Sequence, residues 1–186
     1  FLNGRGVLLA VLDSGITWDL EVFRKTDGST RIRYLWDQTV SEETGDVRYG
    51  KMPDEFSLGT EYTAEEINAA LQLPALDRYR LIPSRDLSGH GTAVAGIAAG
   101  KSADGFYTGA APEAELIVVK LGLPENSGGV EEGFPRTTEI LRGVTYALRK
   151  AGQLNMPLVI NLSFGNSYGS HDGSSLLERF LDNASE

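Results

Sequence analysis

Two short segments of this 186-residue chain carry side chains whose types and spacing suit proton transfer. Asp13, followed by Ser14 and Gly15, closes an apolar run, and His90 stands 77 positions later at the start of a run of small residues. A carboxylate that accepts a hydrogen bond from one ring nitrogen of a histidine fixes its tautomer and stabilises the imidazolium ion. If the fold joins Asp13 to His90, the pair is a general base suited to activate a hydroxyl nucleophile.

Each segment alone also has a purely structural interpretation. Asp-Ser-Gly is a common turn, and His-Gly-Thr at a helix start is compatible with capping or packing. Both segments, however, fall at matching places in one alternating pattern, and one of the chain's two histidines is among them. This joint placement favours the chemical interpretation.

The rest of the chain alternates between strand-like and helix-like patterns. Continuous apolar runs predict strands covered on both faces, and one more polar run, 32–36, predicts a strand nearer an edge. The predicted strands are 7–12, 32–36, 116–121 and 158–163, and the predicted helices are 64–73, 137–151, 174–183 and one that starts at His90. The order predicts a single α/β domain over 1–186, with three αβα layers around a doubly wound, mostly parallel sheet.

Local signals refine these elements. Thr63 with Glu66 predicts a capping box for the helix 64–73, and Ser174 beside Asp172 predicts the N-cap of the last helix. The helix 137–151 has one apolar stripe and a lysine in its last turn, namely Ile140, Val144, Ala147, Leu148 and Lys150. The glycine- and glutamate-rich stretches 41–59 and 124–133 are interpreted as surface loops.

The predicted sheet places the two candidate residues at one edge. Catalytic groups of such sheets gather at the carboxyl ends of the strands, and Asp13 lies one residue past the first predicted strand. Gly15 allows a sharp turn, and the small residues after His90 let their helix lie close to the sheet. A helix N-terminus disfavours the imidazolium ion, so we expect it to help keep His90 neutral.

Composition excludes several other classes. A net charge of −9 gives no footprint for nucleic acid or an anionic membrane, and no apolar stretch reaches the roughly 20 residues that span a bilayer. The absence of cysteine excludes disulfides, thiolate metal sites and a cysteine nucleophile. The chain opens on Phe1 without a signal-like segment, which indicates processing or excision from something longer.

The segments around Asp13 and His90 resemble the Asp and His motifs of the subtilisin-like serine proteases, the subtilases. The likeness also covers Gly109-Ala110-Ala111-Pro112, the strand after it, and the segment 158–165. It implies a serine endopeptidase with a polypeptide substrate, in which Asp13 and His90 are two members of a catalytic triad. No Gly-Thr-Ser-x-Ala setting occurs among the 186 residues. We therefore expect the amino-terminal, truncated part of a catalytic domain, inactive by itself.

The resemblance implies further site residues and partners. The backbone at Ser163, Phe164 and Gly165 would form one wall of the pocket for the residue before the scissile bond, and Ser127 with Gly128 would pair with substrate backbone. Residues 101–108 lack the asparagine-rich calcium loop of secreted subtilisins, so neither a metal nor a cofactor is expected. A propeptide and a pseudoprotease are the further candidate partners.

Three other segments, 31–39, 59–63 and 169–175, resemble the Csp germination proteases of spore-forming Clostridia. This likeness implies a secreted or spore-associated bacterial protein that processes the precursor of a spore cortex-lytic enzyme. At position 93 this chain has alanine where many relatives have a histidine. That histidine is not a proton-transfer group, so we expect its replacement to cause no loss of activity.

Several alternatives stay open. Ser174 between Gly173 and Ser175 imitates a nucleophile motif, but it follows the strand 158–163 closely and suits a cap better. His171 and Asp172 could form a metal pair or a second catalytic dyad, but two adjacent polar residues on a glycine-rich loop more often fix the loop by hydrogen bonds. A non-catalytic, subtilase-like pseudoprotease is the alternative function. An unpaired edge at 158–163 further predicts self-association of the chain.

Overall fold

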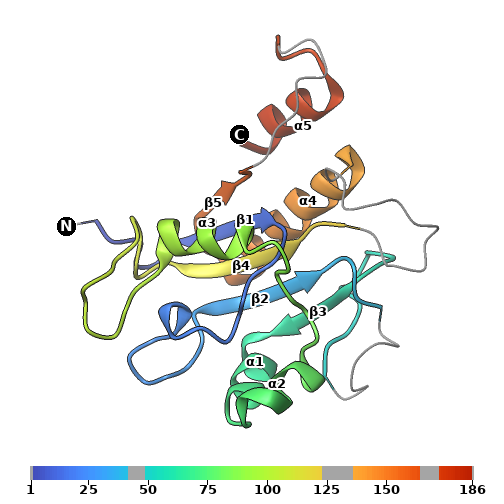
Figure 1. Ribbon diagram of the computed structural model, residues 1–186. Helices are drawn as coiled ribbons and strands as arrows, with labels where there is room; N and C mark the ends of the chain where they lie inside the picture. Colours follow the sequence, from blue (N-terminus) through green and yellow to red (C-terminus); the bar gives the residue numbers. More distant parts are fainter. Residues whose placement is uncertain (1, 42–48, 123–135, 164–171, 186) are drawn as a thin grey trace.

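One five-stranded sheet forms the middle layer of the protein (Figure 1). The computed structural model describes residues 2–41, 49–122, 136–163 and 172–185. The strands are β1 Leu8–Asp13, β2 Ile32–Asp37, β3 Thr60–Thr63, β4 Glu115–Lys120 and β5 Leu158–Asn161. The helices are η1 Glu21–Phe23, α1 Ala64–Leu71, α2 Ala75–Leu81, α3 His90–Ala99, α4 Thr137–Leu154 and α5 Leu176–Ser185. In these ranges no helix is long and apolar enough to cross a membrane.

The strand order is β3-β2-β4-β1-β5, and every neighbouring pair except β2 with β3 is parallel. The predicted α/β class with a mostly parallel sheet is therefore confirmed. β1 lies between β4 and β5, and Lys120 at the end of β4 is in register with both Asp13 on β1 and Asp37 on β2. One level of the sheet thus ends in two buried carboxylates with a lysine between them.

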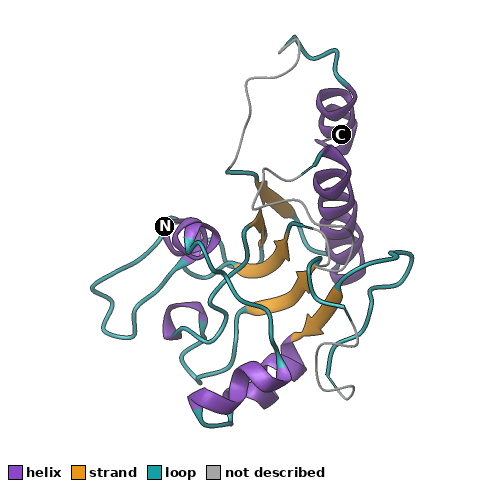
Figure 2. Cartoon of the chain, turned by 45° about the vertical axis from the view of Figure 1, so that its right-hand side comes forward, coloured by secondary structure: helices purple, strands orange, loops and turns teal. Residues whose placement is uncertain are grey.

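Both faces of the sheet are covered, as the continuous apolar runs predict. Successive side chains of a strand point to opposite faces. Accordingly Leu9 and Val11 pack with α1 and α3 on one face, whereas Leu8, Ala10 and Leu12 pack with α4 on the other. Figure 2 shows α4 on the far side of the sheet from α1. The arrangement is the predicted three-layer αβα sandwich.

The segment 32–36 lies one strand from an edge of the sheet, because a strand that the sequence pattern did not indicate takes the edge position itself. β3 pairs antiparallel with β2 and takes the edge position, so β2 lies inside the sheet. Glu61 on β3 is 2% exposed, because Lys150 contributes an ion pair at 2.7 Å and the Tyr146 hydroxyl a hydrogen bond at 2.5 Å. A short strand with a buried glutamate lacks the apolar signal that identified the other strands.

The stretch 41–59 is not wholly the surface loop that its composition suggests. Residues 42–48 lie outside the described ranges, but Phe56 lies 4.7 Å from Trp36, ring centroid to ring centroid. The Trp36 indole N–H also donates to the Leu58 carbonyl at 3.3 Å. This segment therefore covers part of the core. The predicted loop 124–133 lies outside the described residues.

Helix ends differ from prediction by a few residues. Thr63 and Glu66 form the predicted capping box, but α1 ends at Leu71. α4 continues to Leu154, so Lys150 is not in its last turn, and Leu148 is 36% exposed rather than part of the buried stripe. At α5, the Ser175 hydroxyl accepts from the backbone N–H of Glu178, so the cap is Ser175 and not Ser174.

β5 forms the other edge of the sheet, and among the described strands it pairs only with β1. Val159 on this strand is 55% exposed. An edge strand with free backbone groups and exposed apolar side chains is a site where chains associate. Self-association through β5 stays a prediction.

Candidate active site

Asp13 and His90 meet at the carboxyl edge of the sheet. Asp13 is the last residue of β1 rather than the residue after it, and His90 is the first residue of α3. One carboxylate oxygen of Asp13, Oδ1, lies 2.7 Å from His90 Nδ1. Because an ionised carboxylate only accepts hydrogen bonds, Nδ1 carries the proton, and the neutral ring keeps its lone pair on Nε2. The pair therefore has the orientation that a general base requires.

The two side chains differ strongly in exposure. The Asp13 side chain is 3% exposed, whereas the His90 ring is 55% exposed. Asp13 Oδ1 also accepts from the Ser14 backbone N–H at 2.7 Å, and its Oδ2 is buried without a hydrogen-bond partner among the described residues. Asp13 is thus a fixed, desolvated anion, and the imidazole is the group of the pair that can meet a reactant.

The pKa of His90 is raised above its ordinary value. The hydrogen bond to Asp13 and the charge of Asp13 are the main causes, partial burial opposes them, and the charge of Asp86 adds to the increase. The expectation that the helix N-terminus keeps His90 neutral is therefore outweighed. The Asp13 carboxylate acts on the ring at 2.7 Å and the charge of Asp86 adds to its effect, whereas the helix contributes only partial charges.

Gly91 lets α3 approach β1 closely enough for this contact. A Cβ atom at Gly91 would lie 2.3 Å from the Gly15 carbonyl oxygen and 3.1 Å from Asp13 Cβ. Gly15 has a φ of +122°, a conformation that favours glycine, at the turn where the chain leaves β1. The glycine on each side of the contact therefore brings the helix start to the strand end.

Replacing Gly91 with alanine should destabilise the protein and separate the pair. The added methyl group overlaps backbone, so we expect a loss of about 1–3 kcal/mol in the free energy of unfolding, together with a large loss of any activity of the pair. Gly96→Ala on the same helix is the matched control, since its nearest neighbour would be Tyr107 Oη at 3.8 Å. That change should be neutral or stabilising by about 0.5–1 kcal/mol. Urea unfolding of both variants checks this, and equal midpoints would contradict it.

The predicted substrate-binding residues are described only in part. Ser163 follows β5 and is half-buried, and its hydroxyl donates to Asn161 Oδ1 at 2.8 Å. Because β5 is parallel to β1, Ser163 lies toward the same edge of the sheet as Asp13. Phe164, Gly165, Ser127 and Gly128 lie outside the described residues. The substrate-binding role of all five stays a prediction.

The other candidate groups have local structural partners. Asp172 accepts from the Ser174 backbone N–H at 3.0 Å, and Ser175 caps α5. His171 lies outside the described residues. In the segment 101–108, Asp104 accepts from the Ser102 hydroxyl at 2.6 Å, as a turn residue does. Within the described ranges, no three histidine, cysteine or acidic side chains cluster as metal ligands.

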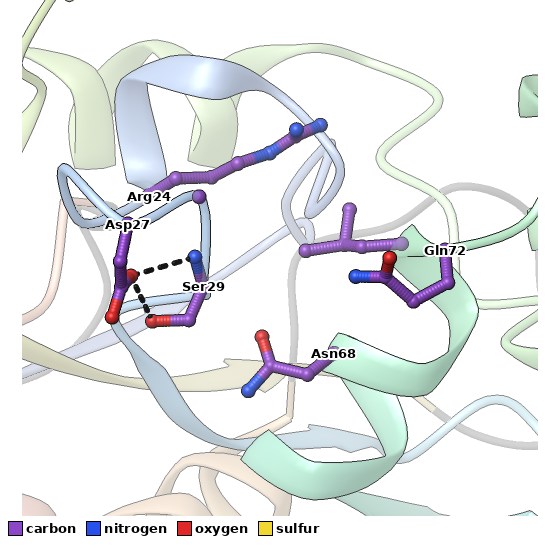
Figure 3. Close-up of a pocket in the computed structure, with 7 residues that line it drawn as sticks. Arg24, Asp27, Ser29, Asn68 and Gln72 are labelled. Atoms are coloured by element: carbon purple, nitrogen blue, oxygen red, sulfur yellow. Dashed lines mark hydrogen bonds between the residues drawn. The ribbon is translucent and has the colours of Figure 1, made fainter.

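A hollow of about 490 Å³ lies between the segment 24–29 and α1, on the amino side of β2 (Figure 3). Its lining does not include Asp13 or His90. Asp27 accepts from both the backbone N–H and the hydroxyl of Ser29, and Asn68 accepts from the Thr30 backbone N–H at 2.8 Å. These hydrogen bonds close the loop and tie it to α1, so Asp27 and Asn68 have a structural role here.

Comparison with known proteins identifies relatives over nearly the whole chain. A family model described as the subtilase family, Peptidase_S8, matches residues 4–184. The Major intracellular serine protease of Bacillus subtilis is 40% identical over 65 residues, which cover 35% of this chain and 18% of that protein.

Solved structures agree with this match. The Clostridium perfringens CspB protease superposes with a TM-score of 0.79 at 33% identity, covering 98% of this chain and 34% of that one. The S41 psychrophilic protease gives 0.58 at 26% identity, covering 99% and 43%. Sphericase gives 0.60 at 21% identity, covering 98% and 43%, a likeness of fold alone. The chain spans 34% to 43% of the length of these three proteins.

Proposed function

Because this chain belongs to the subtilase family, we propose that it is the amino-terminal part of a serine endopeptidase domain in which Asp13 and His90 form two thirds of the catalytic triad. The observation that carries the proposal is the 2.7 Å contact between a buried carboxylate and a half-exposed imidazole at the carboxyl ends of parallel strands. Open α/β sheets place their reactive groups at this edge.

The proposed reaction assigns one task to each group. His90 takes the proton of a serine hydroxyl through Nε2 as the serine oxygen bonds to the scissile carbonyl carbon, and it then returns this proton to the leaving amine as the C–N bond breaks. Asp13 stays ionised and stabilises the imidazolium ion between these steps. Water, deprotonated by His90 in the same way, then bonds to the acyl carbon, and His90 returns this proton to the serine oxygen as its bond to that carbon breaks.

The nucleophile has to come from elsewhere in the full-length protein, because no Gly-Thr-Ser-x-Ala segment occurs among these 186 residues. The substrate class is a polypeptide, with Ser163, Phe164, Gly165, Ser127 and Gly128 as the proposed contacts. The 33% identity to the CspB protease over 98% of this chain supports a Csp-type enzyme and a role in spore germination. The alternative, a pseudoprotease, would keep the fold but hydrolyse no peptide, so the activity measurement described next distinguishes the two functions.

The pH–rate profile of the full-length protein tests the proposal. Only neutral His90 acts as a base, so kcat/KM on a peptide substrate should rise with pH as His90 loses its proton. Since Asp13 raises the pKa of His90 above its ordinary 6.5, the acid limb of the profile should lie above 6.5. A substrate without ionisable side chains is the control. A limb at or below 6.5, or no hydrolysis by the full-length protein, would contradict the proposal.

A further inference from the structure

Asp86 gathers an unusual number of hydrogen bonds just before α3. Its Oδ1 accepts from the Ser14 hydroxyl at 2.8 Å, the Gly89 backbone N–H at 3.0 Å and the Ser88 hydroxyl at 3.3 Å. Its Oδ2 accepts from the backbone N–H and the hydroxyl of Thr92, at 2.8 and 2.6 Å. One half-buried carboxylate therefore has five donors, from both sides of His90 and from the turn after Asp13.

These bonds join the two segments that carry the proposed base and its carboxylate. Ser14, next to Asp13, donates to Asp86 and accepts from the Gly91 backbone N–H at 2.9 Å, next to His90. Thr92, the other bridging residue, donates to Asp86 and accepts from the Thr17 backbone N–H at 2.9 Å. The Ser14 and Thr92 hydroxyls thus bridge the turn after β1 to the first turn of α3, and Asp86 accepts a hydrogen bond from each of them and fixes their orientation.

The backbone before Asp86 is anchored separately. Lys120 Nζ donates to the Arg85 carbonyl at 2.8 Å, and the Arg85 guanidinium lies 4.0 Å from the centre of the Tyr79 ring. Lys120 Nζ also lies 3.6 Å from Asp37 Oδ2. Lys120 on β4 therefore ties the loop that carries Asp86 to the sheet, and Arg85 ties it to α2. These contacts fix the position of Asp86 next to the first turn of α3.

We infer that Asp86 is a positioning residue for the Asp13–His90 pair, holding the turn after β1 and the first turn of α3 in the one relation that puts the imidazole on Asp13. The activity measurements that test this inference rest on the proposed function, whereas the positioning of His90 against Asp13 can be tested without it. An apolar or small residue at position 86 would leave the half-buried Thr92 N–H group without this acceptor, and a donor shielded from water without a partner is costly.

Asp86 also contributes charge to the site. Burial alone would raise its pKa, but the hydrogen bonds from Thr92, Ser14 and Gly89 lower it below the ordinary value, so Asp86 is an anion at neutral pH. The charges of two anions thus act on His90, that of Asp13 on β1 and that of Asp86 in the loop before α3. Among the described residues, two cations near this edge have other partners, Lys120 with Asp37 and the Arg85 carbonyl, and Arg85 with Tyr79.

Asp86→Asn in the full-length protein separates positioning from mere stability. The amide keeps one acceptor oxygen but loses the charge, and its NH₂ group opposes the Thr92 N–H. We expect the plateau of kcat/KM to fall by up to about 100-fold, as for other small displacements of catalytic groups. With one anion removed, the pKa of His90 should fall, so the acid limb should move to lower pH. A purely structural residue would lower the melting temperature and leave that limb in place.

Two further variants complete the test. Ser14→Ala breaks the bridge to Gly91 but keeps the charge of Asp86, so it should lower the plateau of kcat/KM about tenfold or more through displacement of His90. Asp104→Asn is the matched control, a loop carboxylate with the same kind of partners, Ser102 Oγ at 2.6 Å and the Phe106 N–H at 3.0 Å, past the other end of α3. It should change neither the plateau nor the limb.

An NMR titration of His90 reads the same effect without catalysis. The pKa of His90 should fall in Asp86→Asn but not in Asp104→Asn, and the downfield signal of the Nδ1 proton bonded to Asp13 should weaken in Ser14→Ala. If the wild type hydrolyses nothing, the proposed function fails while these signals still decide the inference. If the acid limb and the pKa of His90 in Asp86→Asn equal those of the wild type, the inference is overturned. If Asp86→Asn does not fold, Ser14→Ala decides instead. A plateau of kcat/KM and an Nδ1 proton signal equal to those of the wild type in Ser14→Ala would then overturn the inference.

Discussion

Replacing His90 with alanine should lower kcat of the full-length protein by about 10⁶, the order found when the base of a serine protease triad is removed. The change removes the only group of the proposed site that accepts the nucleophile's proton. Because the His90 side chain is 55% exposed, its truncation should leave the protein folded. Peptide hydrolysis and urea unfolding, measured on the same preparation, separate the two effects.

Ile97→Ala is the matched control for His90→Ala. Ile97 lies on the same helix and is 70% exposed, but it is far along α3 from the contact with Asp13. This variant should hydrolyse the peptide at nearly the wild-type rate. A rate in His90→Ala above one hundredth of wild type would show that the imidazole is not the base.

Asp13→Asn should lower kcat by about 10⁴ and leave the fold intact. Asp13 Oδ1 contacts both the Ser14 N–H and His90 Nδ1, so an amide NH₂ in its place loses the bond from Ser14, donates to Nδ1 and forces the proton onto Nε2. The ring then lacks the lone pair that takes the serine proton. Hydrolysis of a peptide by the full-length variant, at a pH where His90 is neutral, measures the loss.

Asp37→Asn is the control for removing a buried carboxylate at this edge of the sheet. Asp37 is fully buried at the same level as Asp13, in register with Lys120, but its oxygens serve Thr39 and Lys120 rather than His90. It should lose stability and keep turnover within a few-fold of wild type. Equal losses of turnover in the two variants would indicate a general effect of the edge and contradict the role of Asp13.

The parts of the fold that the sequence predicts are those with one dominant physical cause. β1 and β4 are buried on both faces, so their apolar runs are continuous and identify them directly. The Asp13–His90 contact follows because parallel strands end at one edge and because Gly91 permits close approach. Helix α2 carries no buried residue, so it leaves no apolar stripe in the sequence.

The parts that the sequence does not predict depend on distant partners. β3 is stabilised as a strand by Lys150 and Tyr146, both more than 80 positions away from Glu61. Asp86 reads as an ordinary loop residue until the fold brings Ser14 to it across 72 positions. The direction of the His90 pKa shift likewise depends on the 2.7 Å contact, which no local signal gives.

Labelling of the full-length protein by a fluorophosphonate, with the modified residue mapped by mass spectrometry, tests the central claim most directly. The reagent captures a serine oxygen that a neighbouring base has activated. We predict stoichiometric labelling of one serine outside these 186 residues, and loss of that labelling in both His90→Ala and Asp13→Asn. Labelling of Ser174 or Ser175, or labelling that persists without His90, would contradict the claim that Asp13 and His90 form the base of a serine endopeptidase.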